Sequence, residues 1–96
     1  MAGGIGEAIG RSFAEQGARV IVADLDSAAA AAVAHDIGGE AWAVDLTDAA
    51  AIAARPLDID ILVNNAGIQV VSPIEEFDPA KFHLMLGLMV EAPFLL

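Results

Sequence analysis

Short apolar runs alternate with helix-like segments along the chain, and this alternation is what most limits the folds available to it. Three of these runs have the length and composition of short strands, at residues 20–23, 40–44 and 59–63. Helix signals precede, separate and follow them. Strands and helices that alternate on short connections favour an α/β fold of the Rossmann type, with a parallel, doubly wound sheet.

The first two helices have clear starts and stops. In the first, one apolar stripe follows a glycine-rich turn and ends before Gly17, and it consists of Ile5, Ile9 and Phe13. The second is an alanine-rich helix at about 27–37, with Asp26 or Ser27 as its N-cap. Gly38 and Gly39 are expected to end this helix.

The last two helices are predicted at about 47–54 and from about 79 to the end of the chain. Thr47 or Asp45 is expected to cap the first of them. The second contains leucines and methionines nearly all round, so we expect it to be buried. Pro93 should kink or disturb it, because proline has no backbone N–H to donate.

Composition narrows the class of protein. The 96 residues carry a net charge of −10 and are 57% hydrophobic, which predicts one packed domain and excludes a disordered acidic tail. Four basic side chains argue against nucleic acid or an anionic membrane as a partner, and the absence of cysteine excludes disulfides and thiol chemistry. Neither a signal peptide nor a membrane span is evident, so a small ligand and the cytoplasm are the expectation.

Two features predict a dinucleotide site. Gly4-Ile5-Gly6 opens a helix, where glycines permit close approach and free N–H groups favour a pyrophosphate. Asp24 ends the next strand, where its carboxylate can accept both ribose hydroxyls of NAD and repel the extra phosphate of NADP. The alternatives are a turn that only lets the helix pack, and an aspartate that only caps the following helix.

These residues, together with Val44-Asp45-Leu46-Thr47 and Asn64-Asn65-Ala66-Gly67, resemble the short-chain dehydrogenases/reductases along the whole chain. The resemblance implies an NAD-dependent oxidoreductase. It implies that Asp45 and Leu46 flank the adenine and that Asn65 to Gly67 lie along the cofactor. Asn64 follows an apolar strand, where its amide can satisfy backbone groups or touch a ligand, and we favour the structural role. The implied cofactor-binding set is Gly4, Ile5, Gly6, Asp24, Leu25, Asp45, Leu46, Asn65, Ala66 and Gly67.

The substrate loop resembles that of the 3-hydroxybutyrate dehydrogenases within this family, over residues 64–69 and 71–77. The resemblance implies that Gln69 donates a hydrogen bond to the carboxylate of a hydroxy or keto acid. It also implies that the full-length enzyme interconverts 3-hydroxybutyrate and acetoacetate. The alternatives are a solvent-exposed glutamine, another reductase such as a 3-ketoacyl reductase, or a nucleotide-binding module without catalysis.

The chain also departs from the family pattern. It contains no tyrosine, and Lys81 does not stand in the family's Tyr-x-x-x-Lys pair, so no catalytic residue is assigned and we expect no activity from the chain alone. Met89 occupies the position of the family's catalytic asparagine. We expect residues 1–96 to form a partial NAD-binding Rossmann domain that lacks the first strand and the C-terminal half. The family implies a homotetramer formed through the last helix.

The remaining polar residues predict no further site. His35 and His83 lack partners at ligand spacing, so no metal is expected. Glu75 and Glu76 are adjacent and are interpreted as a solvated turn rather than an acid/base pair.

Overall fold

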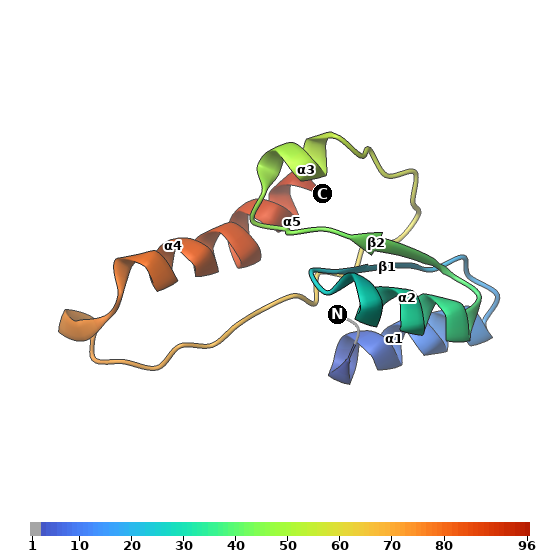
Figure 1. Cartoon of the computed structure of the whole chain (residues 1–96), viewed down its shortest axis with the longest axis horizontal. Helices are drawn as coiled ribbons and strands as arrows, with labels where there is room; N and C mark the ends of the chain where they lie inside the picture. The colour runs from blue at the N-terminus through green and yellow to red at the C-terminus, as the bar shows by residue number, and fades with distance from the viewer. Residues whose placement is uncertain (1–2) are drawn as a thin grey trace. The chain divides into compact units, whose positions relative to one another are not determined.

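A computed structural model describes residues 3–96 (Figure 1). The chain divides into two compact units, residues 1–45 and residues 46–96. Each unit is described by itself.

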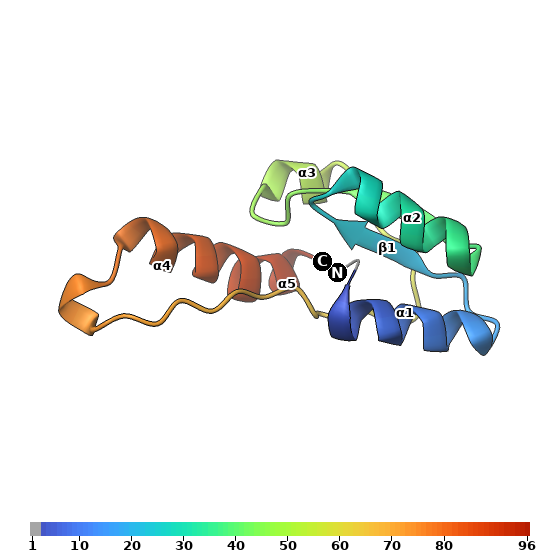
Figure 2. The same cartoon turned by 60° about the horizontal axis from the view of Figure 1, so that its bottom comes forward.

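The first unit is a small α/β layer. Its elements in chain order are α1 (Gly4–Glu15), β1 (Ile21–Asp24), α2 (Ser27–Ile37) and β2 (Glu40–Ala43). The two strands are parallel, with a register that runs from Ile21 opposite Glu40 to Asp24 opposite Ala43. α2 packs on both strands and also contacts α1, as Figures 1 and 2 show. The predicted α/β fold with a parallel sheet is confirmed.

The core of this unit lies between α2 and the sheet. Val22 is 1% exposed and packs with Ala30, Val33 and Ala34, while Val20 and Ile37 cover the edge of the cluster. Burying one valine side chain contributes about 1.5–3 kcal/mol. Because the helix presents alanines to the strands, its backbone can approach the sheet closely.

The ends of α2 follow the sequence signals. Asp26 is the N-cap, and its Oδ1 accepts hydrogen bonds from the backbone N–H groups of Ala28 at 3.0 Å and Ala29 at 3.1 Å. Gly38 ends the helix in the left-handed conformation, with φ 69°. Of the two N-caps that the sequence allowed, the structure uses the aspartate, because Ser27 is already the first helical residue.

Arg11 joins the two helices of the first unit. Its Nε lies 3.4 Å from Oε2 of Glu7 one turn earlier, and its Nη2 lies 3.3 Å from Oδ2 of Asp36 on α2. The hydrogen bond to Asp36 raises the pKa of Arg11 above its usual value, so the guanidinium stays charged at any pH at which the protein folds. The bridge therefore connects α1 to α2.

The second unit is mainly helical. Its elements are α3 (Ala49–Ala53), a 3₁₀ turn (Ile74–Glu76), α4 (Pro79–Leu86), a π-helical segment (Gly87–Glu91) and α5 (Ala92–Leu95). Two buried residues form its centre, where α3 packs on α5: Ile52 is 5% exposed and Ala92 is 1% exposed.

The predicted N-cap of α3 was wrong. The helix begins at Ala49, two residues later than expected, and the cap is Asp48 rather than Thr47 or Asp45. Asp48 has the extended backbone of an N-cap residue, and its Oδ1 accepts from the N–H of Ala51 at 3.2 Å. The cap is the last residue before the helical dihedrals begin, which sequence patterns locate only to within a residue or two.

The third predicted strand was also wrong, because residues 59–63 form no strand. Within residues 3–96 the sheet consists of β1 and β2, so the segment has no ladder partner there. The apolar side chains of the segment are accessible, with Ile61 66% exposed. A run of strand-forming residues becomes a strand only when a neighbouring backbone accepts its hydrogen bonds.

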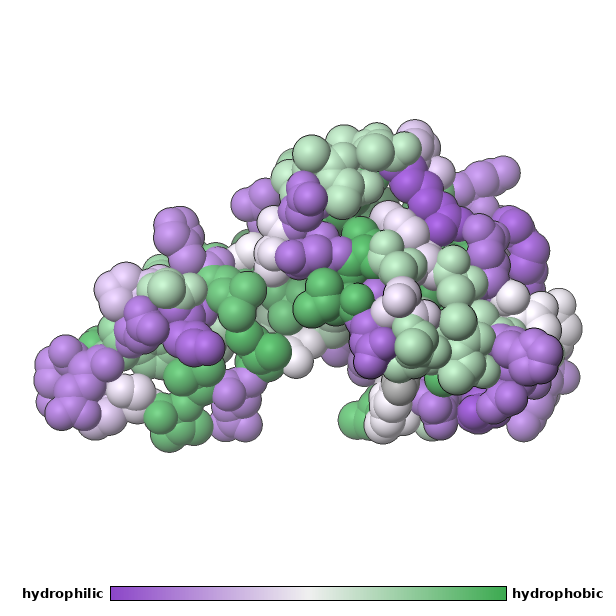
Figure 3. All heavy atoms as spheres, in the orientation of Figure 1, coloured by the Kyte–Doolittle hydropathy of each residue, from purple (hydrophilic) through white to green (hydrophobic). Residues whose placement is uncertain are grey.

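The last helix forms where predicted, and a π-helical segment precedes Pro93, which confirms the expected disturbance. Its predicted burial was wrong. The helix leaves large apolar side chains exposed, and Figure 3 shows hydrophobic surface on the visible face of this unit. The exposed side chains on the helical segments are Phe82, Leu84, Leu86, Met89, Val90, Phe94 and Leu95. Burial requires a covering element, and the described part of the unit does not provide one for this face.

Candidate functional site

The start of α1 is built as an open glycine turn. Gly4 has φ 56°, a left-handed conformation that favours glycine, and a Cβ atom placed on Gly3 or Gly4 would meet no atom within 4 Å. Gly3 is the N-cap and offers no side chain, so no cap occupies the first-turn N–H groups. Ile5 is exposed beside them. This arrangement has the donors and the room that a pyrophosphate requires.

Gly6 and Gly10 have a different role in the same helix. Both are buried, and a Cβ on Gly10 would lie 3.7 Å from Cγ1 of Val20 and 3.9 Å from Cδ1 of Ile37. These two glycines therefore lie on the packed face of α1, while Gly3 and Gly4 lie on its open end. The glycine pattern therefore has two roles. Gly3 and Gly4 leave room for a ligand, and Gly6 and Gly10 allow the helix to pack.

Asp24 occupies the carboxyl end of β1. Its Oδ1 accepts a hydrogen bond of 2.8 Å from the backbone N–H of Asp26, which fixes the carboxylate beside the strand end. Because Asp26 caps α2, the alternative role of Asp24 as the helix cap is excluded. Leu25 follows with an exposed side chain.

Asp45 follows the neighbouring strand. The N–H of Val44 donates to the carbonyl of Asp24 at 3.0 Å, which keeps the chain beside β1 one residue beyond β2. Val44 is buried and Asp45 is exposed. The two aspartates thus follow adjacent parallel strands, at the edge where open α/β sheets bind ligands.

The structure brings the predicted residues of the first unit to one end. Figures 1 and 2 both place the start of α1 at the same end of this unit as the carboxyl ends of β1 and β2. The residues gathered there are Gly4, Ile5, Gly6, Asp24, Leu25 and Asp45. A helix N-terminus beside a strand-end carboxylate suits a ligand with a phosphate at one end of a ribose.

The other predicted residues lie in the second unit. Asn65 and Ala66 are half-buried in an extended loop, and Gly67 and Gln69 are exposed. Leu46 is half-buried at the start of the unit. A Cβ atom placed on Gly67 would lie 3.4 Å from Sδ of Met89. The loop therefore contacts the π-helical segment, a contact that the sequence did not predict.

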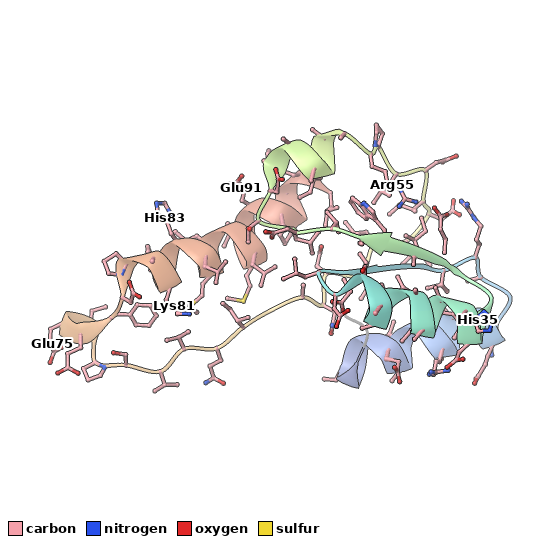
Figure 4. The ribbon with its side chains drawn as sticks, viewed as in Figure 1. His35, Arg55, Glu75, Lys81, His83 and Glu91 are labelled. Atoms are coloured by element: carbon pink, nitrogen blue, oxygen red, sulfur yellow. The ribbon has the colours of Figure 1, made fainter. Side chains whose placement is uncertain are left out.

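The charged side chains of α4 do not converge. Figure 4 shows Lys81 and His83 extending from different sides of the helix, with Glu75 on the preceding 3₁₀ turn. Among residues 3–96, no group of three His, Cys, Asp or Glu side chains could hold a metal ion. Nor does any described helix combine the length and apolar character needed to cross a membrane.

A cavity of about 220 Å³ opens in the second unit between α3 and α5. Its lining is mostly apolar and consists of Ile52, Ala53, Arg55, Pro56, Leu57, Leu95 and Leu96. None of the predicted site residues lines it.

A parallel α/β layer with an open glycine turn and strand-end acids is typical of the Rossmann class of folds. The chain belongs to the short-chain dehydrogenase family, whose model matches residues 1–96. This is the family that the sequence motifs indicated.

Most of the relatives are named as oxidoreductases or dehydrogenases, and several of these names refer to polyols. The chain is 43% identical to an uncharacterised oxidoreductase of Bacillus subtilis, over 98% of this chain and 41% of that protein. It is 36% identical to the D-threitol dehydrogenase of Mycolicibacterium smegmatis, over 99% of this chain and 41% of the relative. It is 40% identical to the sorbitol dehydrogenase of Cereibacter sphaeroides, over 91% of this chain and 38% of the relative. The chain thus spans about two fifths of the length of these relatives.

A solved structure agrees on the fold. A metagenomic short-chain oxidoreductase in complex with NADP matches with a TM-score of 0.86 and 35% identity, over 98% of this chain and 48% of that one. The family binds a nicotinamide cofactor.

Proposed function

We propose that the chain is the NAD-binding part of an oxidoreductase that acts on a secondary alcohol of a small molecule. The position of Asp24 carries the proposal. Its carboxylate is held at the carboxyl end of β1, at the same end of the first unit as the open turn of α1. A carboxylate there accepts hydrogen bonds from ribose hydroxyls and repels a 2′-phosphate.

The residues of the first unit fit the adenosine and phosphate portion of NAD. The uncapped N–H groups of α1 would receive the pyrophosphate, Asp24 the ribose, and Asp45 and Leu25 the surroundings of the adenine. The proposed role of Leu46 beside the adenine and of Asn65, Ala66 and Gly67 along the cofactor rests on the family motif. When bound, NAD supplies the acceptor for a hydride.

Calorimetric titration of the 96-residue chain with NAD and with NADP tests the cofactor proposal. We expect binding of NAD in preference to NADP, and we expect Asp24→Asn to weaken NAD binding and narrow that preference. Asp58→Asn is the matched control, since Asp58 is an exposed aspartate in the second unit. Equal affinity for the two cofactors would contradict the assignment of NAD, and no heat with either would contradict nucleotide binding itself.

The proposed substrate is a 3-hydroxy or 3-keto acid, bound through Gln69. The support is the resemblance of the loop at 64–69 and the exposed position of Gln69, which leaves its amide accessible. A polyol is the second candidate, favoured by the relatives named for threitol and sorbitol.

The side-chain amide resonance of Gln69 separates the two substrates. In the presence of NAD, we expect 3-hydroxybutyrate to shift this resonance and sorbitol to leave it in place. A shift with sorbitol alone would favour the polyol candidate. Neither ligand causing a shift would exclude Gln69 as a substrate-binding residue.

Hydride transfer by the chain alone is not expected. Reduction of a ketone by NADH adds a hydride to the carbonyl carbon and requires a proton for the carbonyl oxygen. The sequence has no tyrosine to donate that proton. NADH consumption with acetoacetate measures this. Turnover by the 96-residue chain would overturn the expectation, whereas nucleotide binding without turnover fits a binding module.

A further inference from the structure

The loop that follows residues 59–63 is in contact with the last helical region through a glycine and a methionine. A Cβ atom on Gly67 would lie 3.4 Å from Sδ and 4.0 Å from Cγ of Met89. The same position would be 3.9 Å from the carbonyl oxygen of Asn65. The thioether therefore lies against Gly67, where a methyl group at position 67 would be in ordinary van der Waals contact with it.

Pro93 follows the π-helical segment from which Met89 contacts the loop. In a continuous α-helix the N–H of residue 93 would donate to the carbonyl of residue 89, and proline has no such donor. The backbone here runs through a π-helical segment at Gly87–Glu91, with Pro93 in the first turn of α5. One extra residue per turn changes the direction of the side chains that precede it by about 100° relative to a regular helix.

We propose that Met89 is a positioning residue for the loop 65–67, held over Gly67 by the π-helical segment that Pro93 imposes. Met89 is 37% exposed and Gly67 is itself exposed, so the contact leaves the glycine accessible to solvent. Thioethers are flexible and polarisable, and they adapt well to the flat surface of a glycine backbone. The consequence for the cofactor rests on the function proposed above: a displaced loop binds NAD less well.

A double-mutant cycle tests the contact directly. Met89→Ala removes the thioether, and Gly67→Ala adds a methyl group at 3.4 Å from Sδ. We expect Met89→Ala to shift the Gly67 amide resonance and to weaken NAD binding about threefold, and we expect Gly67→Ala, whose methyl group contacts the thioether, to weaken it less. In the double variant, the methyl group at position 67 has no thioether to contact, so the combined loss of affinity should differ from the product of the two single losses. Additive effects would contradict the contact.

Two further variants distinguish positioning from general stability. Met89→Leu keeps apolar bulk over Gly67, and we expect it to restore most of the affinity that Met89→Ala loses. Pro93→Ala supplies the missing N–H, and we expect it to shift the Gly67 resonance in the same direction as Met89→Ala. An unchanged Gly67 resonance in Pro93→Ala or Met89→Ala would overturn the proposal. Thermal unfolding of each variant is recorded, and the proposal requires effects on the loop at an unchanged melting temperature.

The two arms of this experiment separate the two proposals. If the wild-type chain binds no NAD, the proposed function is contradicted, while the resonance of Gly67 still decides whether Met89 positions the loop. If NAD binds and Met89→Ala changes neither the resonance nor the affinity, only the role of Met89 is contradicted.

Discussion

Gly39 shows how one residue limits the first unit. A Cβ atom at this position would lie 2.5 Å from the carbonyl oxygen of Val20, which is closer than Cβ atoms in proteins approach a non-bonded atom. Glu40 donates its N–H to the same carbonyl at 2.9 Å, so the chain has to pass close to Val20 for β2 to start its pairing with β1. Glycine is therefore required by the space available here, while Gly38 before it is favoured by its left-handed backbone.

We expect Gly39→Ala to lower the free energy of unfolding by about 1–3 kcal/mol, because backbone has to move to accommodate the methyl group. Urea denaturation followed by far-UV circular dichroism measures the change. Gly3→Ala is the control, since its φ of 174° is extended and its Cβ would meet nothing within 4 Å. If both variants lose the same stability, the close approach at Gly39 is not the cause.

Asp26 tests the helix cap at the same scale. Its carboxylate satisfies two N–H groups of α2, so Asp26→Ala should lower the free energy of unfolding by about 1 kcal/mol. Asp26→Asn keeps an acceptor oxygen and should retain most of the stability. A loss as large in Asp26→Asn as in Asp26→Ala would indicate that charge, rather than capping, is what Asp26 contributes.

At the scale of elements, the segment 59–63 has the strongest mismatch between pattern and structure. It has the apolar composition of a central strand, yet it forms no strand, has no ladder partner within the described chain and is largely exposed. Exposed apolar backbone of this kind is a template for pairing with other chains. Self-association of the protein is therefore expected to begin at this segment.

Ile61→Lys should reduce that self-association, because a charge in the segment opposes edge-to-edge pairing. Light scattering at increasing protein concentration measures it. Ile74→Lys is the control: Ile74 is even more exposed, at 88%, but lies in the 3₁₀ turn beside Glu75 and Glu76. An equal reduction of self-association in both variants would show that overall hydrophobicity, and not this segment, drives association.

Charge acts at the scale of the whole molecule. Four basic and fourteen acidic residues leave a net charge of 4 − 14 = −10 on 96 residues. The excess acidic side chains repel one another in the compact state. At 0.1 M salt, repulsion between exposed charges more than about 10 Å apart is largely screened. Among the described ion pairs, those of Arg11 are partly exposed and are themselves weakened by salt.

The melting temperature should therefore rise as sodium chloride increases from about 10 mM to about 150 mM, because screening of the net charge outweighs screening of a few exposed pairs. Thermal unfolding by circular dichroism measures it. Sucrose at equal osmolality controls for effects that are not electrostatic. A falling melting temperature would mean that the Arg11 bridges contribute more than the net repulsion costs.

Much of the first unit follows from local sequence. The stop at Gly38, the cap at Asp26, the alanine-rich helix and the strand that ends at Asp24 all depend on neighbours within a few residues. Their signals are complete in the sequence, and so are the motifs that assign the family. The predicted cofactor residues Gly4 and Asp24 could be located for the same reason, since each stands at the end of an element.

Only the tertiary structure decided the features that need a distant partner. Residues 59–63 have a strand composition but no ladder partner in the described chain, and the last helix has an apolar surface that stays exposed. Met89 contacts Gly67 from a π-helical segment, a geometry that no periodicity reveals. Caps and turns are satisfied by adjacent residues, whereas strand pairing, burial and side-chain contacts require backbone brought in from elsewhere, and that is why the sequence alone determined the first set and not the second.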